Sequence, residues 1–138
     1  MKISALVQNS EGRHQVTLRT DGNAHSLTVP PKPMGFGSSV NGGELLFLAL
    51  ATCYCNDLYR EAARRGLSIE RVEVEVEGEF GAEGEPASNV TYRVRVAGPG
   101  DEDELRELLK HTDRVAEIQN TLRAGVDVTL MGVEIVDT

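Results

Sequence analysis

Residues 43–55 read Gly-Glu-Leu-Leu-Phe-Leu-Ala-Leu-Ala-Thr-Cys-Tyr-Cys, and this stretch decides how the chain folds. A glycine-rich loop at residues 34–43 leads into it. The acidic Glu44 at its start and the Arg64-Arg65-Gly66 sequence at its end suit the helix dipole and a glycine C-cap. We therefore predict a helix of about six turns over Glu44–Arg65. Its first half is apolar nearly all round, which predicts burial on every side.

Both cysteines of the chain lie on this helix, two positions apart. Because residues i and i+2 of a helix point in different directions, Cys53 and Cys55 are not expected to form a disulfide. At about 100° per residue, Cys53 shares its stripe with Asp57 and Arg60, whereas the stripe of Cys55 stays apolar. A reactive thiol needs solvent access and a nearby positive charge, so Cys53 is the candidate nucleophile and Cys55 a core residue.

A second interpretation of Cys53 stays open. Free cysteine is among the most buried residue types and packs as a small hydrophobe. Asp57 also lies one turn away, and a neighbouring carboxylate raises the pKa of a thiol.

Alternating apolar and polar residues on both sides of the helix predict strands. The expected strands are Ile3–Val7, His14–Arg19, Ala24–Val29, Ile69–Phe80, Val90–Val96 and a closing strand at Val126–Val136. Two further helices are expected, one that begins at an Asp101 cap and one over Asp113–Leu122. This order predicts an α+β fold with mostly antiparallel pairing.

Length and charge limit the classes of function. The 138 residues suit one domain, residues 1–138. With 22 acidic against 14 basic residues and a net charge of −8, we expect no nucleic acid and no membrane as partner. Two cysteines without a secretion signal predict reduced thiols in the cytoplasm. Only 4% of residues are aromatic, which hints that a second subunit completes the core.

Histidine placement argues against a metal centre. His14, His25 and His111 lie in different predicted elements and have no ligand spacing with the cysteines. We therefore expect neither a metal nor another cofactor.

The run Gly-Gly-Glu-Leu-Leu-Phe-Leu-Ala-Leu-Ala-Thr-Cys at residues 42–53, with Asn56-Asp57-Leu58, the stretch at 65–70 and Gln119–Arg123, resembles the OsmC/Ohr family. The resemblance extends from end to end. It implies an intertwined α+β homodimer whose long central helices pack back to back between two sheets. Many members are cysteine-based peroxidases of organic hydroperoxides or hydrogen peroxide. Their thiolate attacks the O–O bond and becomes a sulfenic acid, which a second cysteine resolves.

Carried over by position, Cys53 matches the peroxidatic cysteine of that family. The family's catalytic arginine comes from the N-terminal strands, where Arg13 and Arg19 are the candidates. Ala116 stands where the resolving cysteine is expected, and Gly43 stands where the peroxidases carry a glutamate. Glu44 lies on the opposite side of the helix from Cys53, so we expect it to cap the helix N-terminus.

These residues support two functions of different classes. In the first, Cys53 reduces a hydroperoxide and an external thiol resolves the sulfenic acid. In the second, the chain is a non-catalytic dimer of the same fold, which binds a small apolar ligand under the loop at residues 34–43 and uses Cys53 for packing.

Overall fold

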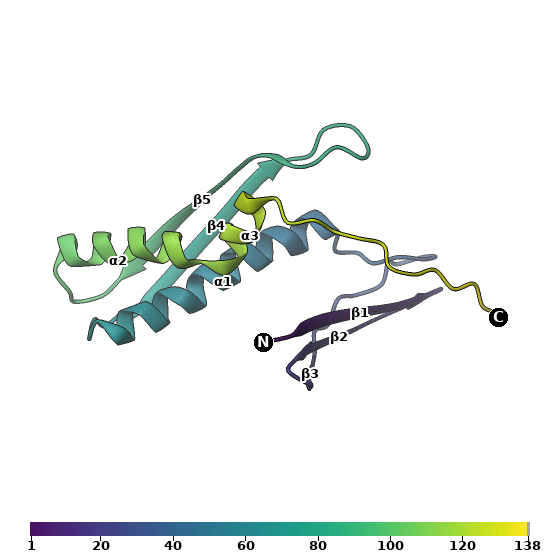
Figure 1. The fold of residues 1–138 in the computed structure, drawn as a ribbon, viewed down its shortest axis with the longest axis horizontal. Coiled ribbons are helices and arrows are strands. Elements are labelled where there is room, and N and C mark those ends of the chain that lie inside the picture. Colours follow the sequence, from purple (N-terminus) through teal and green to yellow (C-terminus); the bar gives the residue numbers. More distant parts are fainter. Residues whose placement is uncertain (138) are drawn as a thin grey trace. The chain divides into compact units, whose positions relative to one another are not determined.

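The computed structural model describes residues 1–137, which divide into two compact units, residues 1–46 and a second unit that begins at Phe47. Its elements are β1 (Ile3–Ser10), β2 (Arg13–Thr20), β3 (Asn23–Ser26), α1 (Gly42–Arg64), β4 (Arg71–Glu79), β5 (Ser88–Ala97), α2 (Glu102–Val115) and α3 (Glu117–Ala124) (Figure 1). The α+β fold class and the antiparallel pairing are confirmed. None of the helices that the structure describes is long and apolar enough to cross a membrane.

The first unit is a three-stranded antiparallel sheet in the order β1-β2-β3. Its second hairpin turns at Asp21 and Gly22, whose φ angles of 48° and 86° are those of the left-handed region. This backbone matches the twist of the two strands that it joins, which is why Asp-Gly is a frequent hairpin sequence. The loop after the sheet folds back on itself, because the Ser39 amide donates to the Pro30 carbonyl at 2.9 Å.

Helix α1 begins with a reciprocal cap. The Glu44 amide donates to Asn41 Oδ1 at 2.8 Å, and the Asn41 amide donates to Glu44 Oε1 at 3.0 Å. Both bonds satisfy amides that the first helical turn leaves without a partner. The predicted capping role of Glu44 is therefore confirmed. The helix ends at Arg64, close to Gly66 at a φ of 67°.

The second unit has its core where α1 and α2 meet the β4–β5 hairpin. The cluster consists of Tyr54, Leu58 and Ala62 from α1 and Leu108 from α2, and valines of both strands pack against it. The strands alternate between half-buried and exposed residues, as the sequence predicts. On the exposed face, Arg95 pairs with Glu73 across the hairpin at 3.3 Å.

The helical region near the C-terminus differs from its prediction. Asp101 caps α2 as expected, since its Oδ2 accepts from the Glu104 amide at 3.1 Å. However, α2 continues to Val115 and α3 begins only at Glu117, so the second predicted helix is confirmed but its predicted start at Asp113 is wrong. Ala116 separates the two helices in an extended conformation and is fully buried. The chain therefore turns at a residue that its own sequence does not mark as a breaker.

Two predictions differ from the structure of this single chain: the closing strand at Val126–Val136 and the burial of the first half of α1. The described residues 126–137 form no helix or strand, although their pattern predicts one, and Val128 is 98% exposed. Leu48 on α1 is 53% exposed, whereas full burial of the first half of the helix is predicted. A strand needs a neighbouring strand to pair its backbone groups, so an alternating pattern alone does not make a ladder.

Candidate functional site

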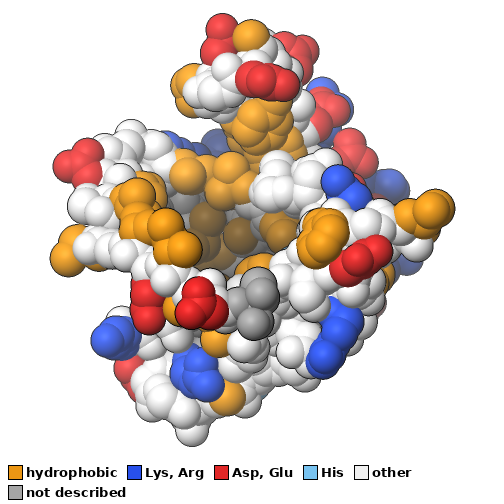
Figure 2. Space-filling model, turned by 90° about the vertical axis from the view of Figure 1, so that its right-hand side faces the viewer, with side chains coloured by type: hydrophobic (Ala, Val, Ile, Leu, Met, Phe, Trp, Pro, Cys, Tyr) orange, Lys and Arg blue, Asp and Glu red, His pale blue; other side chains and the backbone are white. Residues whose placement is uncertain are grey.

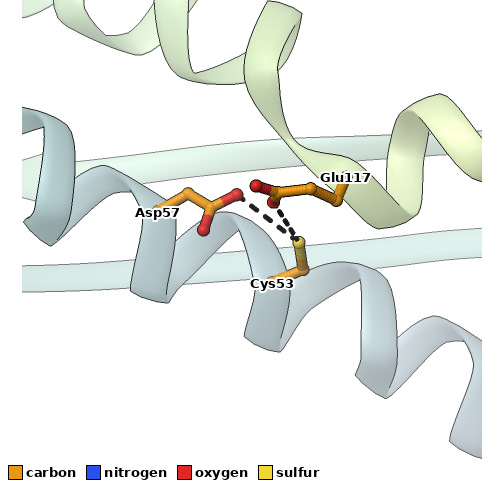
Figure 3. Close-up of side chains that lie close together, drawn as sticks. All are labelled: Cys53, Asp57 and Glu117. Carbon is orange, nitrogen blue, oxygen red and sulfur yellow. Dashed lines mark hydrogen bonds between the residues drawn. The ribbon is translucent and has the colours of Figure 1, made fainter. Parts of the chain in front are cut away.

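The side chain of Cys53 lies between two carboxylates (Figure 3). Its Sγ is 3.5 Å from Asp57 Oδ2 and 3.7 Å from Glu117 Oε2, with the thiol as donor. Asp57 follows Cys53 by one turn of α1, whereas Glu117 opens α3. The sulfur itself is partly buried and retains access to solvent.

Arg60 binds the remaining oxygen of each of these carboxylates. Its Nη1 lies 3.1 Å from Asp57 Oδ1 and 3.4 Å from Glu117 Oε1. One guanidinium therefore bridges α1 and α3 and leaves Oδ2 and Oε2 facing the sulfur.

Glu61 binds Arg60 and fixes the position of its guanidinium. It is 6% exposed, and its Oε2 accepts from Arg60 Nε at 3.1 Å and from Arg64 Nη1 at 2.8 Å. Its Oε1 lies 2.8 Å from His111 Nε2 on α2. The hydrogen bond with His111, followed by the one with Arg60, lowers the pKa of Glu61, so this carboxylate stays ionised.

The electrostatics of the site favour a protonated thiol. Burial raises the pKa of Cys53, and the charges of Asp57 and Glu117 raise it further, although a hydrogen bond from the Ile118 amide lowers it. Burial and the neighbouring Glu117 also raise the pKa of Asp57, while the hydrogen bond with Asp57 lowers that of Glu117. At neutral pH the sulfur therefore rests as a thiol.

The positive charge expected beside a reactive thiol does not contact Cys53 directly in the described part of the second unit but acts through the two carboxylates. Within the second unit the sulfur faces Asp57 and Glu117, and the guanidinium of Arg60 binds the oxygens of these carboxylates that point away from the sulfur.

The other predicted site residues lie elsewhere. Cys55 is half-buried and lines an open hollow of about 250 Å³ with Thr52, Asn56 and Val74 among its neighbours, so its assignment to the core is wrong. Arg13 and Arg19 lie on β2 of the first unit, and the pairing of either with Cys53 stays a prediction.

Sequence reasoning missed the carboxylate from α3. Asp57 and Arg60 are three residues apart on α1, a spacing at which ion pairs form, and this signal was available. Glu117 is 64 residues from Cys53 and has no local pattern that links it to the cysteine. It reaches the sulfur because the chain breaks at the buried Ala116 and starts a new helix there.

The convergence of three donor atoms also raises the question of a metal. The sulfur of Cys53 and one oxygen each of Asp57 and Glu117 lie within 4.8 Å of one another. Arg60 already binds one oxygen of each carboxylate, and the thiol donates toward the two oxygens that remain. This arrangement of one acid between two acceptors is suited to moving a proton.

Known structures share this fold. An OsmC-like protein from Mycoplasma pneumoniae is 20% identical and aligns over 88% of this chain and 86% of its own, with a TM-score of 0.60. An organic hydroperoxide resistance protein OsmC from Legionella pneumophila is 23% identical over 90% of this chain and 92% of its own, with a TM-score of 0.57. At these identities the likeness concerns the fold. A search of the curated proteins finds no significant match.

The sequence itself gives the family. The profile described as OsmC-like protein matches residues 35–131, which is well over half of the chain. This range contains α1 with Cys53, the β4–β5 hairpin and both C-terminal helices. The chain therefore belongs to the OsmC-like protein family, as its sequence pattern predicts.

Proposed function

We propose that this protein is a thiol-dependent peroxidase that reduces organic hydroperoxides or hydrogen peroxide through Cys53. The observation that carries the proposal is the position of the Cys53 sulfur. It is partly exposed, it lies 3.5 Å and 3.7 Å from two carboxylate oxygens, and the backbone amide of Ile118 lowers the pKa of the thiol. A thiol with proton acceptors and a backbone donor beside it can form and hold a thiolate during reaction.

The family and the relatives support the same class of chemistry. The chain is an OsmC-like protein, and one relative of the same fold is an organic hydroperoxide resistance protein. As candidates for an activating cation, the proposal retains Arg13 and Arg19 from the family resemblance.

Resolution of the sulfenic acid needs a thiol from outside the chain. Ala116 stands in the place of the family's second cysteine; it is fully buried, and its methyl side chain cannot resolve a sulfenic acid. Cys55 lies on the same helix at a spacing that points it away from Cys53. In the proposed cycle an external thiol condenses with the sulfenic acid to a mixed disulfide and releases water, and a second thiol regenerates Cys53.

The stoichiometry of peroxide consumption tests this cycle. Without added thiol, we expect the reduced protein to consume about one equivalent of cumene hydroperoxide per chain and then stop, because nothing resolves the sulfenic acid. With dithiothreitol present, consumption should continue until the peroxide is exhausted. The measurement is residual peroxide by a ferrous-xylenol orange assay, with the uncatalysed reaction of dithiothreitol subtracted.

The alternative function gives the opposite result. If a folded, fully reduced protein consumes no peroxide in either condition, the peroxidase proposal is wrong. The non-catalytic dimer that binds a small apolar ligand is then the better account of the fold.

We further propose that the protein works as a homodimer in the cytoplasm. Figure 2 shows hydrophobic side chains exposed at the surface, and contiguous exposed apolar patches mark sites of interaction with other proteins. In the second unit, Leu48 on α1 and the apolar residues of the segment 126–136 are exposed, and the segment has the alternation of a strand. A second copy could supply the neighbouring strand that this segment lacks.

A further inference from the structure

We propose that Asp57 and Glu117 form a shared proton site that removes the proton of the Cys53 thiol and returns it to the alkoxide that leaves the hydroperoxide. This inference rests on the proposed peroxidase function and assigns its acid and base. It is carried by the way in which the two carboxylates, the sulfur and Arg60 face one another.

The two carboxylates come from different helices, yet both turn one oxygen toward the same sulfur (Figure 3). The thiol carries a proton at neutral pH, and this hydrogen lies between the two carboxylate oxygens as acceptors. A base within hydrogen-bond reach of the proton that it removes meets the geometric condition for general base catalysis.

The two oxygens of each carboxylate have different partners. Arg60 binds Asp57 Oδ1 and Glu117 Oε1, and these are the oxygens that do not face the sulfur. The guanidinium therefore fixes both carboxylates while it leaves one oxygen of each free to exchange a proton. Glu61 fixes Arg60 in turn, because Glu61 Oε2 accepts a hydrogen bond from Arg60 Nε at 3.1 Å. Arg60 and Glu61 are positioning residues, because they act through the two carboxylates.

The burial of Asp57 favours its role as a proton acceptor. Asp57 is 7% exposed, and a carboxylate removed from water binds a proton more readily than an exposed one. Its pKa is raised by burial and by Glu117, and this raised pKa brings it nearer to that of the thiol. Proton transfer from the sulfur to the pair is therefore less costly than transfer to an ordinary exposed carboxylate. The Ile118 amide at the start of α3 then stabilises the thiolate that forms.

The chemical step balances as follows. The thiol gives its proton to the Asp57–Glu117 pair and becomes a thiolate. The thiolate attacks the terminal oxygen of the hydroperoxide, so that an S–O bond forms, the O–O bond breaks and the alkoxide leaves. The sulfur is oxidised by two electrons to the sulfenic acid, and the peroxide is reduced by two. The alkoxide takes the proton from the carboxyl pair and leaves as the alcohol.

This assignment predicts opposite effects on two reactions of the same thiol. Iodoacetamide releases iodide, which needs no proton, so its rate follows the amount of thiolate alone. A hydroperoxide releases an alkoxide, which does need one. Asp57→Asn and Glu117→Gln each remove a charge that raises the thiol pKa. At pH 7 we expect them to alkylate at least as fast as the wild type, and their double variant to be oxidised by cumene hydroperoxide about 100-fold more slowly.

The experiment compares both rates by stopped flow, in buffer with EDTA, on folded protein. Glu102→Gln, an exposed carboxylate on α2, is the matched control and should leave both rates unchanged. Because Asp57 is buried, the exposed Glu117→Gln serves if Asp57→Asn does not fold, and alone it should be oxidised about tenfold more slowly and alkylated at least as fast as the wild type. Oxidation within about threefold of the wild type in the folded variants, or equal losses in both reactions, would overturn the shared proton site. A wild type that alkylates but never oxidises would instead refute the peroxidase function, and the proton site with it.

Discussion

Replacing Cys53 with serine should abolish hydroperoxide reduction, with a loss on the order of 10³-fold or more in turnover with dithiothreitol. The reaction needs a nucleophile that changes its oxidation state, and a serine hydroxyl does not form a sulfenic acid equivalent. The fold should survive, because serine is close to cysteine in volume and can donate to Asp57 and Glu117 as the thiol does. The measurement is the initial rate of cumene hydroperoxide consumption, together with far-UV circular dichroism of the variant.

The matched control is Cys55→Ser, two positions along the same helix. Cys55 lines an open hollow with Thr52 and Asn56 and belongs to another face of α1. We expect this variant to retain turnover within about twofold, since surface substitutions away from special features have small effects. Equal losses in both variants, or turnover that survives in Cys53→Ser, would contradict the assignment of the reaction to Cys53.

A charge on the apolar side of the C-terminal segment should separate the proposed dimer. Val128 is 98% exposed in the single chain and has the alternation of a buried strand residue. If a second copy covers it, Val128→Lys loses about 1.5–3 kcal/mol of burial and adds the cost of burying a charge. Because each 1.4 kcal/mol is tenfold, the dimer should weaken at least about tenfold. The measurement is the dissociation constant from sedimentation equilibrium.

Thr129→Lys provides the control for this prediction. It adds the same charge at the next residue, whose side chain points to the opposite face of a strand. We expect it to leave the dimer unchanged. A wild-type chain that sediments as a monomer, or two variants that weaken the dimer equally, would argue against the proposed role of this segment.

The sequence predicts most of the elements of this fold because their signals are local. The alternation of valines and glutamates gives β4, and the apolar run with Glu44 and Arg64 at its ends gives α1. The break between α2 and α3 has no such signal. Its position depends on burial of Ala116 against the rest of the unit, and no glycine or proline marks it.

The candidate site shows the same limit. Helical geometry on its own places Cys53 on one stripe with Asp57 and Arg60, and the structure confirms that Asp57 contacts the sulfur and that Arg60 contacts Asp57. It does not reveal Glu117, which reaches the sulfur only through the packing of α3. Without that second carboxylate, the sequence predicts a cation beside the sulfur. The structure shows instead a thiol held between acceptors, with Arg60 on their far side.

The central claim is that Cys53 is a redox nucleophile, and the most direct test is to trap its sulfenic acid. Reduced wild-type protein is mixed with one equivalent of cumene hydroperoxide in the presence of dimedone, and its peptides are analysed by mass spectrometry. The account predicts a dimedone adduct on Cys53 and none on Cys55. Unmodified Cys53 in folded protein, with the peroxide still present, would contradict it.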